Sequence, residues 1–414
     1  MTGTGPVVVL GTGQAGQQTA ISLRQAGFDG RVVLVGDEPE LPYRRPPLSK
    51  GYLTGDVDAA GLLLRTADYY AAHDIEVLPA QRAVEILRSE HRVRLRDGRS
   101  LDYQHLVLAL GSRNREVPVP SADLPGVLGL RTLADADALR DRLRSARDVV
   151  VVGGGFVGLE VATSASAFGA RVTVVEAQER LLARVATPQT SEFFARAHRS
   201  RGVRLLLGHR VARFLGDDSV STVEIESGER IAADLVLVGA GAVPDVELAR
   251  EAGLAERDGV VVDAWLRTSD PDISAIGDCA RFPSPFAAEP VRIESVQNAV
   301  DQARCVAARL TGAPAEYRAV PWFWSDQAGT RLQIAGLTGG HDRTVLRGDP
   351  DSGRFSVFCF RGNALLGADS VGRPAEHLAV RRLLGTGPAP NLTPDQAADP
   401  DFDVAGHARA ADPR

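Results

Sequence analysis

Two glycine-rich turns, one near the start of the chain and one in its middle, have the residue types and spacing of a phosphate-binding device. The first comprises Gly11, Gly13 and Gly16 after the apolar run 6–10, and the second comprises Gly153, Gly155 and Gly158 after the run 148–152. In such a turn the first glycine permits a tight bend, the second lets the backbone approach a pyrophosphate, and the third lets helix and strand pack closely. The N–H groups of the following helix then favour phosphate. Each turn therefore predicts a dinucleotide site.

An acidic residue follows each turn at the distance expected for binding a ribose. Asp37 lies 21 residues after Gly16, and Glu176 lies 18 residues after Gly158, each at the end of the next apolar run. A carboxylate at this place accepts hydrogen bonds from the ribose diol of NAD and repels the 2′-phosphate of NADPH. Glu176 therefore favours NADH, although Arg180 is close in sequence and could soften this preference.

The pair of turns is more specific than either turn alone. The chain has 42 glycines in 414 residues, so a single match to the spacing is weak, whereas two matches between apolar strand and helix indicate function. Two dinucleotide sites indicate two cofactors, and the simplest pair is FAD and NADH. Hydride transfer between these cofactors needs no protein nucleophile, because the protein supplies position and electrostatics.

Further apolar runs must provide the strands that position the remaining polar residues. Residues 106–110 lead into Gly111, residues 233–238 into Gly239, and residues 273–276 into Gly277 and Asp278. Strands that alternate with helices predict an α/β fold. At the end of its strand, Asp278 is expected to contact a cofactor rather than only to cap a helix.

Length and composition limit the class of protein. A chain of 414 residues with 44% hydrophobic and 24% charged residues is expected to fold into two or three domains. The net charge of −6 argues against nucleic-acid binding. No apolar run is long enough to span a bilayer, and the start of the chain lacks the pattern of a secretory signal, so we expect a cytoplasmic protein without membrane association.

The cysteines and histidines do not have the spacing of a metal or redox centre. Cys279, Cys305 and Cys359 are far apart and form no CxxC pair. This spacing does not fit an iron–sulfur cluster within the chain, and free thiols in a reducing compartment are expected. Cys279 is therefore interpreted as a core residue despite its place beside Asp278. No metal site is predicted.

Several longer motifs resemble one family. They are residues 42–50 (PYRRPPLSK), 153–160 (GGGFVGLE), 276–278 (IGD), 294–298 (ESVQN) and 321–327 (PWFWSDQ). With them the chain resembles, from about Val7 to Ala410, the FAD-dependent NADH:ferredoxin reductases of bacterial monooxygenase and dioxygenase systems. The resemblance implies an α/β fold of two Rossmann-like dinucleotide-binding domains, as in glutathione reductase, plus a C-terminal α/β domain.

The resemblance also implies domain boundaries. A discontinuous FAD-binding domain would comprise residues 1–113 and 235–316. An NAD-binding domain would comprise residues 114–234, and the C-terminal α/β domain residues 317–414.

The resemblance implies a set of FAD-binding residues on this chain. They are Gly11, Gly13, Ala15, Gly16, Asp37, Lys50, Ala83, Arg131, Asp278, Val296 and Trp324. Leu110 stands where the family often has a threonine, so any hydrogen bond from that hydroxyl is lost. Trp322 and Trp324 flank Phe323, and one of these tryptophans is expected to face inward and the other outward.

A second set of residues is implied for NAD and for catalysis. The NAD-binding residues are Gly153, Gly155, Val157, Gly158, Glu176, Arg184 and Gly241. Lys50 and Glu160 are the implied catalytic residues, with Glu160 near the nicotinamide and paired with Lys50.

The implied reaction delivers electrons to a separate protein. A flavin can divide the two electrons of NADH into single steps. The implied partner is a 2Fe–2S ferredoxin, bound transiently and electrostatically, that supplies a haem-thiolate monooxygenase or a Rieske-type oxygenase. Arg304, Arg309, Arg381 and Arg382 could form a basic surface for it, although a merely solvated face is equally compatible. The reductase itself is expected to be a monomer or a weak dimer.

Two other classes of enzyme are considered. A disulfide reductase needs two close cysteines beside the flavin and an NADH peroxidase needs one, whereas residues 46–50 contain none. A flavin- and NADH-dependent redox sensor, or an NADH oxidase without a ferredoxin partner, stays open as the alternative.

Overall fold

The computed structural model describes residues 5–387 and 392–411. Its contacts divide the chain into two compact units, each assembled from separated segments. The first unit comprises Met1–Arg44, Ala59–Arg113 and Val243–Pro321, and the second comprises Arg45–Asp58, Asn114–Ala242 and Trp322–Arg414. Residues 1–4, 388–391 and 412–414 of the predicted domains lie outside the described residues.

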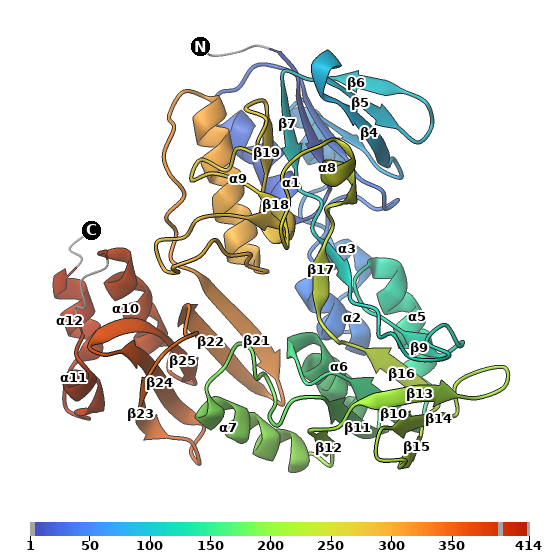
Figure 1. Ribbon diagram of the computed structural model, residues 1–414, viewed down its shortest axis with the longest axis vertical. Helices are drawn as coiled ribbons and strands as arrows, with labels where there is room; N and C mark the ends of the chain where they lie inside the picture. Colours follow the sequence, from blue (N-terminus) through green and yellow to red (C-terminus); the bar gives the residue numbers. More distant parts are fainter. Residues whose placement is uncertain (1–4, 388–391, 412–414) are drawn as a thin grey trace. The chain divides into compact units, whose positions relative to one another are not determined.

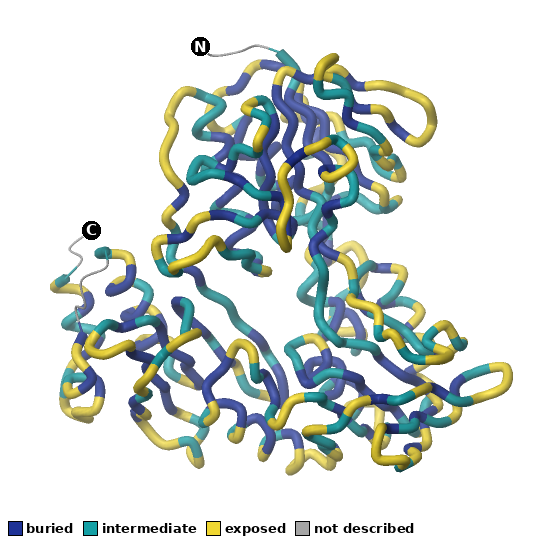
Figure 2. Tube along the Cα trace, viewed as in Figure 1, coloured by how far each residue is buried: buried dark blue, intermediate teal, exposed yellow. Residues whose placement is uncertain are grey.

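A parallel sheet forms the core of the first unit (Figure 1). Its strands, in order across the sheet, are β19 (Ile273–Ala275), β7 (His105–Leu108), β1 (Val7–Leu10), β2 (Val32–Val35) and β3 (Ile75–Leu78). All residues of β1, β2, β7 and β19 are buried, and the strands are dark in Figure 2. Strands covered on both faces need continuous apolar runs, which explains the Val-Val-Val-Leu sequence of β1. Helices α1 (Gln14–Gln25) and α9 (Val296–Leu310) pack against each other in this unit.

A second parallel sheet repeats this arrangement in the other unit. Its strands, in order, are β12 (Arg204–Leu207), β11 (Arg171–Glu176), β10 (Asp148–Val152), β16 (Leu235–Val238) and β9 (Val127–Leu128). Its helices are α5 (Leu133–Leu143), α6 (Phe156–Ala167) and α7 (Pro188–Arg199). The register is also repeated, because Val7 pairs with Val32 in the first sheet as Val149 pairs with Val172 in the second.

A small antiparallel sheet follows β3 in the first unit and β12 in the second. In the first unit it consists of β4 (Ala83–Leu87), β5 (Arg92–Leu95) and β6 (Ser100–Asp102). In the second unit it consists of β13 (Val211–Leu215), β14 (Thr222–Ile225) and β15 (Arg230–Ala232). From β1 to β7 and from β10 to β16 the chain runs through the same order of strands, as expected for two Rossmann-like domains, whereas β19 follows its series and β9 precedes the other.

An antiparallel sheet near the C-terminus completes the second unit. Its strands, in order, are β21 (Trp322–Gln327), β22 (Thr330–Gly336), β25 (Ala364–Val371), β24 (Arg354–Arg361) and β23 (Arg343–Asp349). Helix α10 (Pro374–Gly385) packs on β22 and β25, and it contacts α12 (Val404–Ala411), while α11 (Pro394–Ala398) contacts β23. The edge strand β21 contacts α6 and so joins this sheet to the second glycine loop.

One segment of the second unit comes from far away in the sequence. The 3-10 helix η1 (Pro46–Ser49) and helix α2 (Gly51–Thr54) lie between β2 and β3 in the chain, yet they pack against α5 and α6. The other short elements are α3 (Ala59–Leu62), α4 (Ala67–Ala72), η2 (Arg88–Glu90), β8 (Ser112–Asn114), β17 (Ala242–Pro244), α8 (Glu247–Glu251), β18 (Val260–Val261), η3 (Gly277–Cys279) and β20 (Ala280–Arg281). Across the described residues, no helix is long and apolar enough to cross a membrane.

Candidate functional site

The first glycine loop has the shape of a pyrophosphate cradle. Gly11 has a φ of +109°, and a Cβ there would overlap the carbonyl oxygen of Ala109. A Cβ at Gly16 would overlap the carbonyl oxygen of Gly11, whereas one at Gly13 would meet nothing within 4 Å. Helix α1 starts at Gln14 with no side-chain cap and no acidic residue in its first turn. The loop therefore presents backbone N–H groups to open space, which fits a dinucleotide phosphate such as that of FAD.

Asp278 lies beside this loop. Gly277 passes so close to α1 that a Cβ on it would lie 3.1 Å from the Cβ of Ala15. The next residue, Asp278, has a carboxylate that accepts a hydrogen bond from Ser112 Oγ at 3.2 Å. Helix α9, which contacts η3, begins at Val296. The predicted FAD residues Ala15, Asp278 and Val296 are thus held on elements that pack together.

Cys279 is a core residue, as the sequence suggests. Its side chain is fully buried, and Sγ lies 3.3 Å from the carbonyl oxygen of Ile276. Burial raises the pKa of this thiol to about 11. A protonated, buried thiol is a poor nucleophile, so no thiol chemistry is assigned to this position.

Asp37 lies just after β2, and Ala83 lies at the start of β4. Asp37 follows β2 and is exposed to solvent. The preceding residue, Gly36, accepts a backbone hydrogen bond from Gln81 N at 2.7 Å, which brings the segment leading to Ala83 alongside the end of β2. Ala83 opens β4 opposite Leu95. This placement is compatible with the ribose and adenine contacts predicted for them.

The second glycine loop repeats the first. Gly153 has a φ of +106°, and a Cβ there would overlap the carbonyl oxygen of Gly239. A Cβ at Gly158 would overlap the carbonyl oxygen of Gly153, whereas one at Gly155 would meet nothing within 4 Å. Val157, in the first turn of α6, is 41% exposed. The loop fits a second dinucleotide, with Val157 on its accessible side.

Glu176 is tied to this second loop through its carboxylate. Oε2 accepts a hydrogen bond from Gly154 N at 2.5 Å, and Oε1 accepts one from Gln178 N at 2.7 Å. A carboxylate has about four acceptor positions, so it can still accept hydrogen bonds from a ribose diol. The Arg180 guanidinium donates to Ser191 Oγ and to the carbonyl oxygen of Ala186, so it has partners within the fold, and its effect on the preference for NADH stays a prediction.

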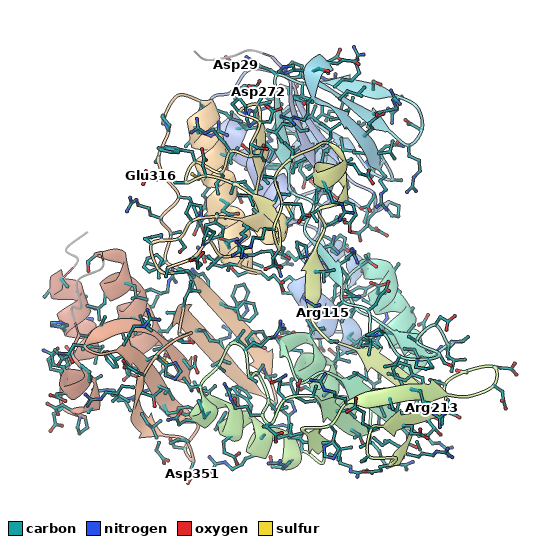
Figure 3. The ribbon with its side chains drawn as sticks, viewed as in Figure 1. Asp29, Arg115, Arg213, Asp272, Glu316 and Asp351 are labelled. Carbon is teal, nitrogen blue, oxygen red and sulfur yellow. The ribbon has the colours of Figure 1, made fainter. Side chains whose placement is uncertain are left out.

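Two arginines flank Gly241. Arg184 is exposed, and its Nη2 lies 3.2 Å from the place that a Cβ of Gly241 would occupy. The Nε of Arg115, which is labelled in Figure 3, lies 3.8 Å from the same place. Arg115 N also donates to the carbonyl oxygen of Gly241 at 2.9 Å. The structure thus brings together Arg184 and Gly241 and adds Arg115, which the sequence did not reveal.

Lys50 and Glu160 form a partly buried ion pair. Lys50 Nζ lies 2.8 Å from Glu160 Oε2, and the Glu160 side chain is only 5% exposed. Ser49 Oγ donates to the same carboxylate oxygen at 2.5 Å, and Ser325 Oγ donates to Oε1 at 2.6 Å. The pairing that the resemblance implied is therefore present, whereas the catalytic role of the two residues stays a prediction.

The expected placement of the two tryptophans is wrong. Trp322 and Trp324 lie on the same face of β21, with ring centroids 5.5 Å apart. Phe323 points to the other face and contacts Phe156 of α6 at 4.4 Å between centroids. The reason is that side chains of a strand alternate with a period of two residues, so i and i+2 share a face.

Three residues predicted beside FAD belong to the second unit, namely Lys50, Arg131 and Trp324. Arg131 precedes α5, and its carbonyl oxygen accepts a hydrogen bond from Arg45 at 2.7 Å. Their contact with the cofactor stays a prediction.

The basic residues considered for partner binding are divided in the same way. Arg304 and Arg309 lie in the first unit, and Arg381 and Arg382 in the second. Arg309 donates to Ser274 Oγ at 2.6 Å, and Arg381 stacks over the ring of Trp322 at 4.4 Å. At least these two side chains therefore have partners within the fold.

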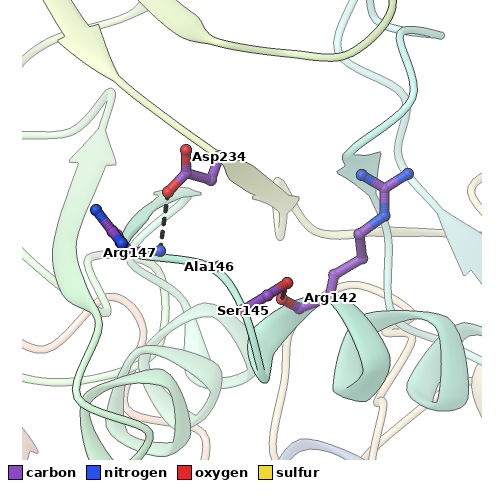
Figure 4. Close-up of a pocket in the computed structure, with 5 residues that line it drawn as sticks. All are labelled: Arg142, Ser145, Ala146, Arg147 and Asp234. Carbon is purple, nitrogen blue, oxygen red and sulfur yellow. Dashed lines mark hydrogen bonds between the residues drawn. The ribbon is translucent and has the colours of Figure 1, made fainter.

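A pocket of about 410 Å³ lies at the amino ends of β10 and β16, whereas the second glycine loop lies at the carboxyl end of β10 (Figure 4). It is lined by Arg142, Ser145, Ala146, Arg147 and Asp234. Arg147 and Asp234 directly precede β10 and β16, whereas the glycine loop follows β10. Ligands of open α/β sheets bind at the carboxyl ends of the strands, so this pocket is not the dinucleotide site.

The comparisons with known proteins agree with this geometry. Residues 5–303 match the family model described as pyridine nucleotide-disulphide oxidoreductase, and residues 322–408 match that described as reductase C-terminal. Rhodocoxin reductase from Rhodococcus erythropolis is 51% identical over 96% of this chain and 93% of its own length. Putidaredoxin reductase from Pseudomonas putida is 43% identical over 91% of both chains.

A solved structure is also similar. The reductase in the covalent putidaredoxin reductase–putidaredoxin complex superposes with a TM-score of 0.95 at 41% identity, over 99% of both chains. The predicted glutathione-reductase-like fold class is thereby confirmed. The chain belongs to the pyridine nucleotide-disulphide oxidoreductase family, in the group that contains the ferredoxin reductases of bacterial oxygenase systems.

Proposed function

We propose that this protein is an FAD-dependent reductase that oxidises NADH and delivers electrons to a 2Fe–2S ferredoxin. The observation that carries the proposal is the pair of glycine loops. Each has a second glycine facing open space and an uncapped helix N-terminus, one in each unit. Two phosphate cradles in one chain match a reaction between two dinucleotides.

The cofactors are assigned to the loops by their acidic residues. FAD is assigned to residues 1–113 and 235–316, where Asp278 stands beside the Gly11 loop. NADH is assigned to residues 114–234, where Glu176 provides a carboxylate at the ribose position. The repulsion between this carboxylate and a 2′-phosphate supports NADH over NADPH.

The chemistry at the nicotinamide is assigned to the residues around Glu160. When bound, FAD supplies the capacity to accept a hydride and to release electrons singly. Glu160 lies on α6 directly after the glycine loop, and its carboxylate holds Lys50 at 2.8 Å. A fixed positive charge beside a buried carboxylate orients both groups before the substrate arrives, so no reorganisation is needed during the reaction.

The electron acceptor is assigned to a separate protein. Each NADH carries two electrons and a 2Fe–2S ferredoxin takes one, so two ferredoxin molecules are reduced for each NADH. The chain offers no dithiol as an alternative acceptor, because Cys279, Cys305 and Cys359 are all free and Cys279 and Cys359 are buried. We expect a transient, electrostatic complex, a monomeric or weakly dimeric reductase, and a cytoplasmic location.

A direct test uses the purified protein reconstituted with FAD. NADH oxidation is followed with a panel of 2Fe–2S ferredoxins, with NADPH as the competing donor and oxygen alone as the control acceptor. We expect rapid ferredoxin reduction with NADH and slow oxidation with oxygen. Fast oxygen consumption without ferredoxin turnover would instead indicate an NADH oxidase, and negligible turnover with every acceptor would indicate a redox sensor.

A further inference from the structure

A chain of buried side chains connects the Lys50–Glu160 pair to helix α7. Ser325 Oγ donates to Glu160 Oε1 at 2.6 Å. Gln327 Nε2 donates to Ser325 Oγ at 3.2 Å, and His198 Nε2 lies 3.1 Å from Gln327 Oε1. The exposed fraction is at most 5% for each of Glu160, Ser325, Gln327 and His198. The four residues come from α6, β21 and α7, so the chain crosses from the second glycine loop to the C-terminal sheet.

The direction of every hydrogen bond in this chain is fixed by the carboxylate. An ionised carboxylate can only accept, so the hydroxyl of Ser325 must donate to Glu160. The lone pairs of that hydroxyl then accept from the amide of Gln327, and the carbonyl of Gln327 accepts from His198 Nε2–H. Among the described residues, His198 Nδ1 has no hydrogen-bond partner, which agrees with a neutral ring protonated on Nε2.

The surroundings of His198 keep it in this neutral form. Burial lowers the pKa of His198, the hydrogen bond with Gln327 opposes this shift, and the positive charge of Arg201 lowers it further. A neutral His198 has one N–H to donate, and its orientation toward Gln327 polarises the whole chain toward Glu160. Bonds in such a chain strengthen one another in a medium of low dielectric constant.

We propose that Ser325, Gln327 and His198 are positioning residues, which hold the Glu160 carboxylate in place against Lys50 for the reaction with NADH. This inference rests on the proposed function and adds a part for the C-terminal sheet, which contributes Ser325 and Gln327 through β21. Among the described residues, the polar groups that contact the Glu160 carboxylate are Ser49 from η1, Lys50 just after it, and Ser325 from β21. Ser325 is the donor to Oε1, while Oε2 faces the other two.

The chain is suited to orientation rather than to proton transfer. A proton could pass through the amide of Gln327 only if the amide formed its imidic tautomer, which is unfavourable. The chain therefore stabilises the negative charge on Glu160 without carrying a proton between this residue and His198. Removing the Ser325 hydroxyl would leave Oε1 buried without this donor, which destabilises the buried negative charge and loosens its hold on Lys50.

The first experiment compares Ser325→Ala, Ser325→Thr and Thr163→Val in the FAD-loaded enzyme. Thr163 is the matched control, because its Oγ1 accepts from Ala328 N at 3.0 Å at the same contact of α6 and β21 but has no link to Glu160. Turnover of NADH with ferricyanide is measured between pH 5 and 9. In Ser325→Ala we expect kcat to fall about tenfold with little change in KM, and the acid limb of the profile to move up by about one pH unit.

The rescue and the control decide between positioning and mere packing. Ser325→Thr keeps the hydroxyl and is expected to restore the wild-type profile, and Thr163→Val is expected to leave it unchanged. The proposal is overturned if Ser325→Ala keeps the wild-type pH profile, or if Thr163→Val shifts it equally. A wild-type enzyme inactive with NADH contradicts the proposed function instead, and the two failures are therefore distinguishable.

A second experiment tests the hydrogen-bond chain from Glu160 to His198 without measuring turnover. Nitrogen-15 NMR of protein labelled at histidine reports the tautomer of His198, identified by its absence in His198→Gln. We expect the Nε2–H tautomer in the wild type at pH 7. In Gln327→Glu a carboxylate faces His198, so we expect the ring to become doubly protonated at a pH at least one unit higher than in the wild type. An Nδ1–H tautomer in the wild type would contradict the chain.

Discussion

The two parallel sheets share their strand order and the backbone of their glycine loops, and they differ in how each loop is supported. By register, Gly36 in the first sheet is the counterpart of Glu176 in the second, because each follows the pairs Leu10–Val35 and Val152–Val175. A Cβ at Gly36 would overlap the side chain of Thr12. In the first loop, the side chain of Thr12 therefore packs directly against Gly36.

The second loop has the reverse arrangement. Gly154 is the counterpart of Thr12. The carboxylate of Glu176 fills the space there and accepts a hydrogen bond from Gly154 N. The acidic residue of the first loop, Asp37, comes one position later and is exposed. The comparison teaches that Glu176 supports its loop directly, in addition to the ribose contact predicted for it, whereas Asp37 has only the predicted contact.

The largest expected effect comes from the third glycines, which separate the two sites. Gly16→Ala places a methyl group against a backbone oxygen, and we expect a loss of about 3 kcal/mol in FAD binding. Gly158→Ala should leave FAD bound and weaken the binding of NADH by a similar amount. Flavin absorbance after desalting and KM for NADH measure the two effects, with Gly13→Ala and Gly155→Ala as variants whose methyl groups meet only ligand space. Release of flavin from Gly158→Ala would contradict the assignment of the loops.

A smaller effect is expected from the two acidic residues. Glu176→Gln removes one acceptor from both the loop and the ribose. We therefore expect transition-state stabilisation with NADH to weaken by about 2 kcal/mol, which lowers kcat/KM for NADH, while kcat/KM for NADPH falls less. Asp37→Asn should weaken FAD retention and leave the NADH-to-NADPH ratio unchanged. The ratio of kcat/KM for the two donors is the measurement, and an unchanged ratio in Glu176→Gln would exclude this residue as the ribose acceptor.

The sheets also differ in a buried histidine. His105 in β7 occupies the place of Leu235 in β16, and burial together with the positive charge of Arg309 lowers its pKa to about 3. The unfolded chain binds a proton near pH 6.5, so stability is lost as the pH falls below 6.5, by up to about 1.4 kcal/mol for each pH unit.

His105→Leu makes the first sheet like the second and should flatten this dependence. Urea unfolding at pH 7 and pH 5 measures it, because the difference between the two free energies should shrink in the variant. His91→Gln is the control, since this histidine of the same unit is about half exposed. An equal pH dependence in His105→Leu and in the wild type would show that His105 does not titrate during unfolding.

The smallest effect on cofactor binding is expected just after β19 and β9, which are the corresponding outer strands of the two sheets. After β19 the first unit has Gly277 and Asp278, whereas after β9 the second has Arg131 and Thr132, and Thr132 caps α5. Asp278→Asn should therefore weaken the binding of FAD by about 1 kcal/mol without any change in the affinity for NADH. Fluorescence of released flavin measures the loss, and Ser112→Ala, which removes one hydrogen-bond donor to this carboxylate, should have a weaker effect of the same sign.

Local patterns were sufficient to predict the parts of the site that lie within one strand–turn–helix segment. The glycine loops, Glu176 and Asp278 each depend on a few consecutive residues, and the structure has them at the ends of the expected strands. Lys50 and Glu160 are separated by more than a hundred residues, and only the resemblance connected them. The roles of all these residues toward the cofactors stay predictions.

Long-range packing explains what the sequence did not reveal. The η1 segment packs with the second unit although it lies between two strands of the first, and no local pattern indicates this. Ser325, Gln327 and His198 meet only because β21 docks on α6. The alternation of strand residues could have placed Phe323, Ser325 and Gln327 on one face, and the same rule would have corrected the expectation for the tryptophans.

The two faces of β21 also limit how this protein can change in evolution. One face carries Phe323, Ser325 and Gln327 toward α6 and α7, and the other carries the paired tryptophans. A slip of one residue would exchange both faces at once, with indole rings at the carboxylate and polar side chains where the rings stack. Insertions or deletions that shift this strand should therefore survive in related sequences only as pairs of residues.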